Sequence, residues 1–304
     1  MKIFLTGATG VIGIRVIPLL TASGHQVTAV VRSPDRAQQL LSPHVNPIQL
    51  DLFDRHSVEQ ALGEHDAVIN LATHIPPTSR ALFRSSWREN DRIRKFASAN
   101  LVDAAISQGI RRFIQESFAP IYADRGDEWI DEKWPIEPVS YNSTVLDAEQ
   151  AVKRFLSDGG HGVILRFALF YGPDKGGATL DLIKFVQKGW VPFPGKPENF
   201  ISSVSHDDAA TAVVAALNVP PGIYNVTDNE PVRGREYFNS LAETLRIRPP
   251  RFLPKWIIPL TGSLGKMFSR SLRISNWKLR ENSEWTPRYP SVYEGWEVLV
   301  HQLK

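Results

Sequence analysis

The sequence contains no cysteine among its 304 residues, which excludes disulfide bonds, a thiolate nucleophile and cysteine-ligated metal sites. It also lacks any apolar run near the ~18 residues that a membrane-spanning helix needs, and Pro259 interrupts the apolar segment 256–260. The N-terminal apolar run ends early, at Thr6 and Gly7, so its layout differs from that of a signal peptide. These absences predict a cytoplasmic protein without membrane contact.

The chain also has little net charge, +3 at pH 7, and its basic residues are spread rather than clustered. Nucleic-acid binding is therefore not indicated. Three neighbouring cations, Arg92, Arg94 and Lys95, lie in the stretch 82–108, which has the apolar spacing of a helix. We predict that they form the solvated face of this helix. The expected partner of the protein is a small-molecule substrate.

The most informative segment is the glycine-rich stretch 6–13, TGATGVIG. A buried strand is predicted before it and a helix over 11–20. Glycine at these places allows a sharp turn, a close approach of backbone to a pyrophosphate and tight helix–strand packing, and the helix start stabilises the anion. The alternative is an ordinary glycine-rich loop. The residues expected to hold the dinucleotide here are Gly7, Thr9, Gly10, Val11, Ile12 and Gly13.

The end of the second predicted strand, 26–31, indicates which dinucleotide is bound. An acidic residue at this point favours the free ribose 2′-hydroxyl of NAD, whereas a cation favours the 2′-phosphate of NADP. Here the strand ends at Arg32, with Ser33 and Arg36 close behind. NADP(H) is therefore favoured over NAD(H), the alternative being that these arginines are merely solvated.

Further strands are predicted at 45–50, 66–71, 111–115 and 162–169, alternating with helices at 82–108 and 141–156. This alternation predicts an α/β fold with a doubly wound parallel sheet. Ligands of such sheets bind at the carboxyl ends of the strands. The residues that we expect beside the cofactor at these ends are Asp51, Leu52, Leu71, Ala72, Thr73, Phe167, Ala168 and Leu169.

Proline and glycine become frequent after Tyr171, as is typical of loops and short elements in a smaller lobe. A helix and a strand predicted over about 203–227 could rejoin the sheet. The expected division is a cofactor-binding domain over 1–170, rejoined by about 203–227, and a substrate lobe formed by 171–202 and 228–304.

Many other motifs occur in an order that is similar to one known family. They include NLA at 70–72, RFI at 112–114, YGP at 171–173, SHDDA at 205–209, YNV at 224–226 and WTPRYP at 285–290. With the glycine-rich stretch, they make nearly the whole chain resemble the extended short-chain dehydrogenase/reductase family, also called the NAD-dependent epimerase/dehydratase family. The resemblance implies a Rossmann fold with a smaller C-terminal substrate lobe, and a possible homodimer. It also implies a helix start at His206, Asp207 and Asp208, where the two aspartates favour the helix dipole. These three residues resemble a metal cluster only superficially, so no metal site is expected.

That family uses a Tyr-x-x-x-Lys motif and a serine or threonine four residues before the tyrosine that follows the fifth strand. This sequence keeps Tyr141 but has Val145 at the lysine position and Phe118 at the serine position, with Ser117 one place earlier. A phenol titrates near pH 10, so without a nearby cation only about one in a thousand is ionised at pH 7. We expect Tyr141 to act as a neutral hydrogen-bond donor, which suits reduction better than oxidation.

Four residues are candidates for replacing the missing groups. Ser117 could act if the strand end shifted by one residue, although strand alternation points it away from Phe118. Glu116 could be a base or an ordinary ion-paired carboxylate, and His74 could reach the substrate or be structural. The fourth candidate is Lys133.

Three functions remain open. The first is an NADP(H)-dependent reductase or epimerase-type oxidoreductase of a hydrophobic small molecule, with Tyr141 and Ser117 as catalytic residues and His74, Phe118 and Trp190 as substrate contacts. The second is a non-redox lyase, dehydratase or cyclase on the same fold. The third is a catalytically silent NADP(H)-binding sensor, as the two altered motif positions would allow.

Overall fold

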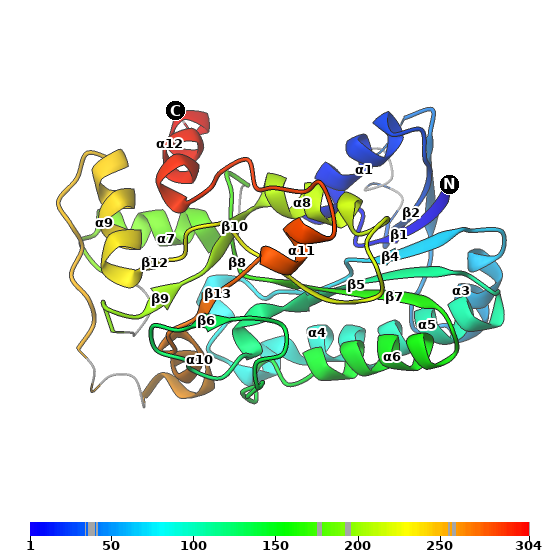
Figure 1. The fold of residues 1–304 in the computed structure, drawn as a ribbon, viewed down its shortest axis with the longest axis horizontal. Coiled ribbons are helices and arrows are strands. Elements are labelled where there is room, and N and C mark those ends of the chain that lie inside the picture. Colours follow the sequence, from blue (N-terminus) through cyan, green and yellow to red (C-terminus); the bar gives the residue numbers. More distant parts are fainter. Residues whose placement is uncertain are drawn as a thin grey trace.

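The computed structural model describes residues 1–33, 35, 40, 42–174, 178–191, 196–254, 256 and 260–303. Arg36, which we expect near the cofactor, lies outside these residues. The described chain forms a layered sheet domain with a smaller C-terminal part beside it (Figure 1). None of the described helices is long and apolar enough to span a membrane.

The centre of the molecule is a seven-stranded sheet with the order β11-β7-β5-β4-β1-β2-β3, in which all neighbouring strands are parallel. The predicted doubly wound parallel sheet is thus confirmed. The strands are short and largely buried, as parallel strands covered on both faces must be. They are β1 (Lys2–Thr6), β2 (Gln26–Val31), β3 (Val45–Gln49), β4 (Ala67–Asn70), β5 (Arg112–Phe118), β7 (His161–Phe167) and β11 (Gly222–Val226).

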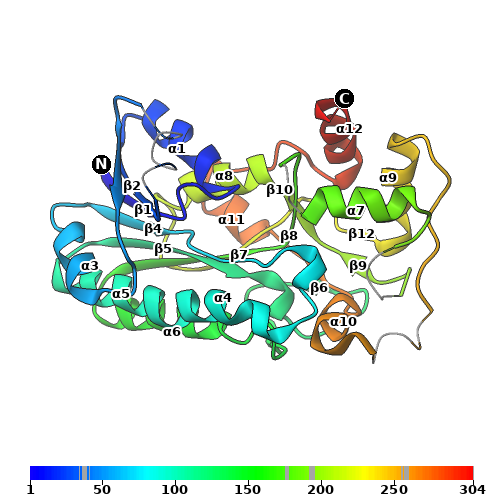
Figure 2. The same cartoon turned by 180° about the vertical axis from the view of Figure 1, so that it is seen from behind.

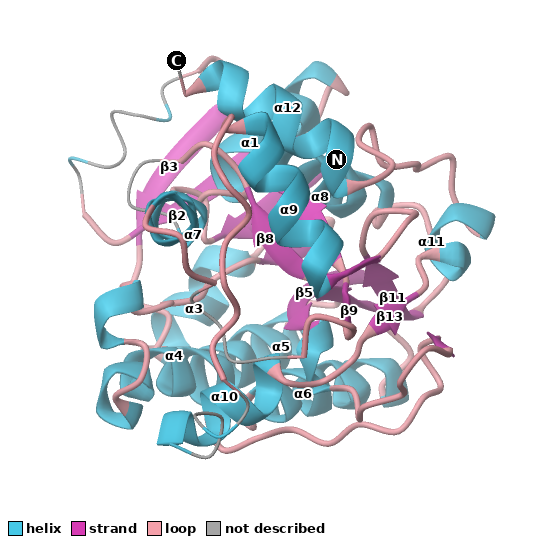
Figure 3. Cartoon of the chain, turned by 90° about the vertical axis from the view of Figure 1, so that its left-hand side faces the viewer, coloured by secondary structure: helices cyan, strands magenta, loops and turns pink. Residues whose placement is uncertain are grey.

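Helices cover both faces of this sheet (Figures 2 and 3). Alternation along β1 determines the two cores: Ile3 and Leu5 pack in one hydrophobic cluster, and Phe4 packs in the other. Helices α1 (Gly13–Ala22) and α8 (His206–Ala215) cover the first face. Helices α3 (Arg55–Leu62), α5 (Ser98–Ser107) and α6 (Val145–Ser157) cover the second.

The predicted helix 82–108 is divided into several pieces. A short 3₁₀ turn, η3 (Arg84–Trp87), leads into α4 (Arg88–Arg92), the single π-helical turn η4 (Ile93–Ala97) and then α5. A π turn holds more residues than an α turn and changes which side chains face inward. The predicted helix 141–156 also starts later, because residues 141–144 form a turn before α6.

The C-terminal part has its own aromatic core around Trp296, Tyr237 and Tyr171, whose rings are in contact. It is built from short strands and helices that lie beside the large sheet, among them α7, α9 and α12 (Figure 1). Its elements, with the small elements elsewhere, are η2 (Thr78–Arg80), η5 (Ala119–Ile121), β6 (Trp129–Ile130), β8 (Leu169–Tyr171), α7 (Ala178–Gln187), β9 (Phe200–Ile201), β10 (Ser203–Ser205), β12 (Val232–Arg233), α9 (Gly234–Thr244), α10 (Gly262–Phe268), β13 (Arg273–Ile274), α11 (Trp277–Glu281) and α12 (Val292–Gln302).

A buried ion pair ties α6 to the sheet. Arg166 on β7 donates to both carboxylate oxygens of Glu149 on α6, at 2.8 and 2.7 Å, and to the hydroxyl of Tyr122 at 2.9 Å. The Tyr122 hydroxyl in turn donates to Asn225 on β11, at 2.8 Å. A buried pair of this kind is stable because its remaining donors and acceptors are also satisfied.

We predict that Arg166→Met lowers the free energy of unfolding by about 3–5 kcal/mol, because it leaves the carboxylate of Glu149 buried without its cation. The measurement is urea unfolding. The control is Arg154→Met, which removes a half-exposed partner of Asp103 from the same helix and is expected to change stability by no more than about 1 kcal/mol. Equal effects of the two substitutions would contradict this account.

Candidate functional site

The glycine-rich loop is held so tightly that two of its positions have no room for a side chain. Gly7 has a φ of 70°, and a Cβ built there would lie 2.4 Å from the carbonyl oxygen of Leu71. A Cβ on Gly13 would lie 2.2 Å from the carbonyl oxygen of Gly7. The loop therefore lies directly on the segment that follows β4.

Asn70, the last residue of β4, fixes that segment. Its Oδ1 accepts hydrogen bonds from the hydroxyl of Thr6 at 2.6 Å and from the amide of Ala72 at 3.2 Å. Its side-chain amide donates to Ser98 at 3.2 Å and to Gln115 at 2.9 Å. All four atoms lie at the carboxyl end of the sheet, so one buried side chain joins β1, β4, β5 and α5 there.

The same loop has free donors where a phosphate would lie. The backbone amides of Val11 and Ile12 have no hydrogen-bond acceptor among the described residues, and they precede the first turn of α1. A Cβ on Gly10 would make one tight contact, with the Gly7 carbonyl oxygen at 3.2 Å, and would meet no other atom within 4 Å, so most of the space beside this residue is uncovered. Free amides, a helix dipole and an uncovered backbone are what a pyrophosphate requires, so the site fits a dinucleotide cofactor.

Arg15 on α1 links this loop to two acidic residues further along the chain. It donates to the carbonyl oxygen of Val11 at 2.7 Å, to Asp174 at 2.9 Å and to Asp207 at 2.8 Å. His206 Nδ1 lies 2.5 Å from the other carboxylate oxygen of Asp174. Burial disfavours the charged form of Asp174, but hydrogen bonds from His206 and Arg15 outweigh it and lower the pKa of this carboxyl to about 2.

The predicted helix start at His206 is confirmed, since α8 begins there with Ser205 accepting a hydrogen bond from the Asp208 amide. No group of three or more metal-binding side chains occurs in the part of the chain that the structure describes.

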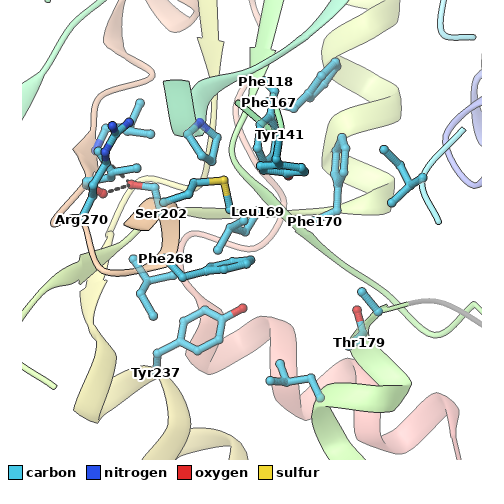
Figure 4. Close-up of a pocket in the computed structure, with 18 of the residues that line it drawn as sticks. Phe118, Tyr141, Phe167, Leu169, Phe170, Thr179, Ser202, Tyr237, Phe268 and Arg270 are labelled. Carbon is cyan, nitrogen blue, oxygen red and sulfur yellow. Dashed lines mark hydrogen bonds between the residues drawn. The ribbon is translucent and has the colours of Figure 1, made fainter. Parts of the chain in front are cut away.

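A cavity of about 330 Å³ extends from the glycine loop to the C-terminal part. Its size lies within the range of about 300–1,000 Å³ that is usual for small-ligand pockets. In Figure 4, Phe118, Phe167 and Tyr141 lie together, with Tyr237 and Phe268 across the cavity. The space beside the cofactor site is therefore mainly apolar and aromatic.

Tyr141 lies in the wall of this cavity, with its ring edge-on to Trp87 at a centroid distance of 4.4 Å. No described residue forms a hydrogen bond with its hydroxyl. Burial raises the pKa of this phenol above its usual value, the charge of Arg94 opposes that rise, and Glu116 adds to it. The hydroxyl is thus a neutral, unused donor at neutral pH.

Arg94 is the residue that sequence reasoning missed. The prediction that it lies on a solvated helix face is wrong: its side chain is 6% exposed, lines the cavity, and donates from Nη2 to Glu116 Oε1 at 3.1 Å. The π-helical turn η4 explains this, because it turns Arg94 inward and leaves Phe96 exposed. Glu116 is therefore an ion-paired carboxylate, one of the two alternatives stated for it.

The other candidates for the missing groups lie elsewhere. The Ser117 hydroxyl donates to Glu149 at 2.6 Å, on the side of β5 away from Phe118, so the structure does not bring it to the cavity. Lys133 is exposed, and its backbone amide donates to Asp131. Val145, at the expected lysine position, is buried at the start of α6 and does not line the cavity.

Of the three expected substrate contacts, only Phe118 lines the cavity. The backbone amide of His74 donates to Asn90 at 2.9 Å, which holds the loop between Thr73 and Ile75, and these two neighbours line the cavity instead. Trp190 does not line the cavity and is 43% exposed, whereas its neighbour Val191 does line the cavity. In both cases the adjacent residue faces the pocket.

The expected cofactor residues divide into two groups. The first lines the cavity and consists of Gly7, Gly10, Val11, Ile12, Gly13, Leu71, Thr73, Phe167 and Leu169. The second lies outside its lining and consists of Thr9, Arg32, Ser33, Asp51, Leu52, Ala72 and Ala168. Arg32 is exposed just after β2 and can be reached by a ligand. Ala168 is fully buried and cannot be reached.

The parallel sheet, the glycine loop and the open amides together define a dinucleotide-binding protein. The family model described as NAD(P)H-binding matches residues 7–220, so the chain belongs to this NAD(P)H-binding Rossmann family. Its structural neighbours are extended short-chain dehydrogenase/reductase epimerases and dehydratases, and the resemblance inferred from the motifs is confirmed.

Two curated relatives and one solved structure illustrate this similarity. A 3-diazoavenalumate denitrifying reductase of Streptomyces sp is 29% identical, over 97% of this chain and 99% of the relative. A 4-hydroxy-2-methyl-3-oxo-4-farnesyl-3,4-dihydroquinoline-1-oxide ketoreductase of Stigmatella aurantiaca is 26% identical, over 82% and 74%. A human epimerase family protein solved with NADPH has a TM-score of 0.81 at 20% identity and covers all of both chains (100% each).

The loop geometry predicts different effects for two glycine substitutions. Gly13→Ala is expected to lower the unfolding free energy by about 1–3 kcal/mol, because its Cβ would overlap the Gly7 carbonyl. Gly10→Ala is expected to cost less stability than Gly13→Ala, because its Cβ would press on the Gly7 carbonyl at 3.2 Å rather than 2.2 Å, and to weaken NADPH binding, because Gly10 lines the cavity. Thermal unfolding and a fluorescence titration with NADPH measure the two effects. A Gly10→Ala protein as unstable as Gly13→Ala would contradict this reading of the loop.

Proposed function

We propose that this chain is an NADP(H)-dependent reductase of an apolar small molecule, acting on a carbonyl group or on a double bond conjugated to one. The observation that carries the proposal is the cavity itself. It joins the cofactor loop to Tyr141 through a lining of aromatic rings. Such a space accepts a flat hydrophobic substrate more readily than a highly hydroxylated one, since it offers few polar partners.

The relatives support the reductase assignment. The two curated proteins described above are named as a reductase and a ketoreductase, and a third, from Stenotrophomonas maltophilia, is named as a 2-alkyl-3-oxoalkanoate reductase. The names of the last two include a 3-oxo group. A carbonyl acceptor in the present cavity agrees with these names.

The reaction would add one hydride and one proton to the substrate. A bound reduced nicotinamide supplies the hydride. Tyr141 donates its phenolic hydrogen bond to the carbonyl oxygen, which gains negative charge as the hydride arrives, and then passes it a proton that solvent replaces. Since burial keeps this phenol protonated, it is suited to donation and poorly suited to removing a proton from an alcohol.

Arg32 supports the preference for NADP(H). It is exposed directly after β2, and its backbone carbonyl accepts a hydrogen bond from Gln49 at 3.4 Å, while no described residue binds its guanidinium group. A free guanidinium at this strand end is suited to a 2′-phosphate, which it can bind with charge-assisted hydrogen bonds.

The reductase assignment predicts that a panel of apolar aldehydes, ketones and enones contains substrates that consume NADPH. Tyr141→Phe should lower kcat by ~10²–10⁴-fold, because it removes the proton donor while the ring keeps its contact with Trp87. The measurement is the loss of the near-ultraviolet absorbance of NADPH, with product analysis. Tyr293→Phe, on the exposed side of α12, is the control and should retain full activity.

Two outcomes would contradict the reductase assignment. One is an absence of NADPH consumption across the panel. The other is conversion of a substrate without any change in nicotinamide absorbance, which would indicate a non-redox lyase, dehydratase or cyclase.

The cofactor assignment predicts that Arg32→Glu weakens NADPH binding by ~10–100-fold, the equivalent of about 1.5–3 kcal/mol for a charged hydrogen bond, and weakens NADH binding much less. Fluorescence titration with each dinucleotide measures the ratio. Lys2→Glu makes the same charge change at the first residue of β1, at the opposite edge of the sheet, and should leave the ratio unchanged. A similar loss for both dinucleotides in Arg32→Glu would contradict the role of Arg32.

A further inference from the structure

The cavity contains a buried cation although the motif position for a lysine is occupied by Val145. Arg94 uses only one of its three side-chain nitrogens: Nη2 lies 3.1 Å from Glu116 Oε1 and 3.4 Å from Oε2. Nε and Nη1 have no acceptor among the described residues. Three of the five N–H donors of the guanidinium are therefore unpaired at the cavity wall.

The backbone brings this group to the cavity that Tyr141 also lines in two steps. Helix α4 carries the chain toward the cavity, and the π-helical turn η4 then directs Arg94 inward, against the end of β5 where Glu116 stands. The same turn packs against α6, whose first residue is Val145. Asp91 on α4 accepts a hydrogen bond from Thr144 at 2.9 Å, so the turn that holds Tyr141 is joined to α4, which leads directly into the turn that holds Arg94.

A purely structural ion pair is the competing explanation. Such a pair is stable only when its remaining donors are also satisfied, because burying a charge without them is unfavourable. Glu116 satisfies one nitrogen of Arg94, and no described side chain satisfies the others. Since these donors belong to a residue that lines the cavity, a bound molecule is the partner that would complete them.

We propose that Arg94 is a catalytic residue that replaces the missing lysine, and that its free N–H groups donate, together with the hydroxyl of Tyr141, to the substrate oxygen that gains negative charge. Glu116 is a positioning residue that holds the guanidinium toward the cavity. The inference rests on the proposed reductase function. It requires a substrate that has an oxygen acceptor within an otherwise apolar, planar frame.

The arginine differs chemically from the lysine it replaces. A guanidinium keeps its proton at any pH the protein survives and offers several donors in a fixed plane. It can therefore stabilise a developing oxyanion without giving up its charge, while Tyr141 supplies the transferred proton. The charge of Arg94 also opposes the effect of burial on the phenol, which assists that transfer.

The first test compares Arg94→Met with Lys95→Met, which removes an exposed cation from the same π-helical turn. Arg94→Met should lower kcat by ~10²–10³-fold, with KM for NADPH and the circular dichroism spectrum unchanged. Lys95→Met should behave as the wild type. In Arg94→Ala, added guanidinium ion should restore part of the lost kcat, and this rescue is not expected of a merely structural residue.

The second test does not depend on turnover. Benzoate is a planar apolar probe whose carboxylate mimics the charged oxygen, and calorimetry measures its binding to the protein with NADP⁺ bound. The wild type and Lys95→Met should bind it equally, and Arg94→Met at least ~10-fold more weakly. Glu116→Gln, which keeps the shape of the positioning residue but removes its charge, should weaken binding less than Arg94→Met does.

The outcomes separate this inference from the proposed function. If the wild type reduces substrates and Arg94→Met retains its kcat, the role of Arg94 is wrong and the reductase assignment stands. If the wild type reduces nothing, the benzoate experiment still decides whether Arg94 binds an anionic oxygen. Equal benzoate binding by wild type and Arg94→Met, or binding by neither, would overturn the inference.

Discussion

The contact between Gly7 and the backbone of Leu71 determines where the rest of the site lies. The two segments approach so closely that no side chain fits between them, and a second contact of this kind, Gly13 on the Gly7 carbonyl, brings the start of α1 onto the same point. The loop therefore cannot shift without moving β4 or α1. Packing therefore fixes the position of this loop, whose residues with unpaired amides, Val11 and Ile12, line the cavity.

Buried polar side chains make this geometry rigid at the carboxyl edge of the sheet. Asn70 joins β1, β4 and β5, and the pair of Arg166 and Glu149 joins β7 and α6. In both groups the donors and acceptors satisfy one another. Arg94 and Tyr141 differ from these groups, because Nε and Nη1 of Arg94 and the hydroxyl of Tyr141 have no acceptor among the described residues. Polar groups that a rigid fold leaves unpaired in a cavity are available for a ligand.

The sequence was sufficient for those parts of the structure that depend on local pattern. Short apolar runs predicted the parallel strands, and the spacing of glycines predicted the loop, because each signal reflects a steric requirement within a few residues. The position of Arg94 could not be predicted in this way. Its burial results from one π-helical turn, which apolar spacing does not reveal, and from an ion pair with a strand residue 22 positions later.

Strand alternation accounts for the placement of Ser117. Since neighbouring residues of β5 face opposite sides, a cavity that contains Glu116 and Phe118 directs Ser117 toward Glu149. Trp190 and His74 show a limit of sequence-based prediction in loops. A loop has no periodicity that determines which side chain faces a pocket, and in both cases an adjacent residue lines the cavity instead.

The proposed replacement of the motif lysine by Arg94, which lies on a different helical segment, has a consequence for the direction of the chemistry. The lysine of the family motif belongs to the same helix as its tyrosine and lowers the pKa of the phenol, which helps that tyrosine to accept a proton from an alcohol. Here the cation is paired with Glu116, whose charge acts on Tyr141 in the opposite sense to that of Arg94. The two effects offset each other and burial keeps the phenol neutral. A neutral acid together with a permanent cation is suited to adding a proton and stabilising an oxyanion, which agrees with the proposed reductase function.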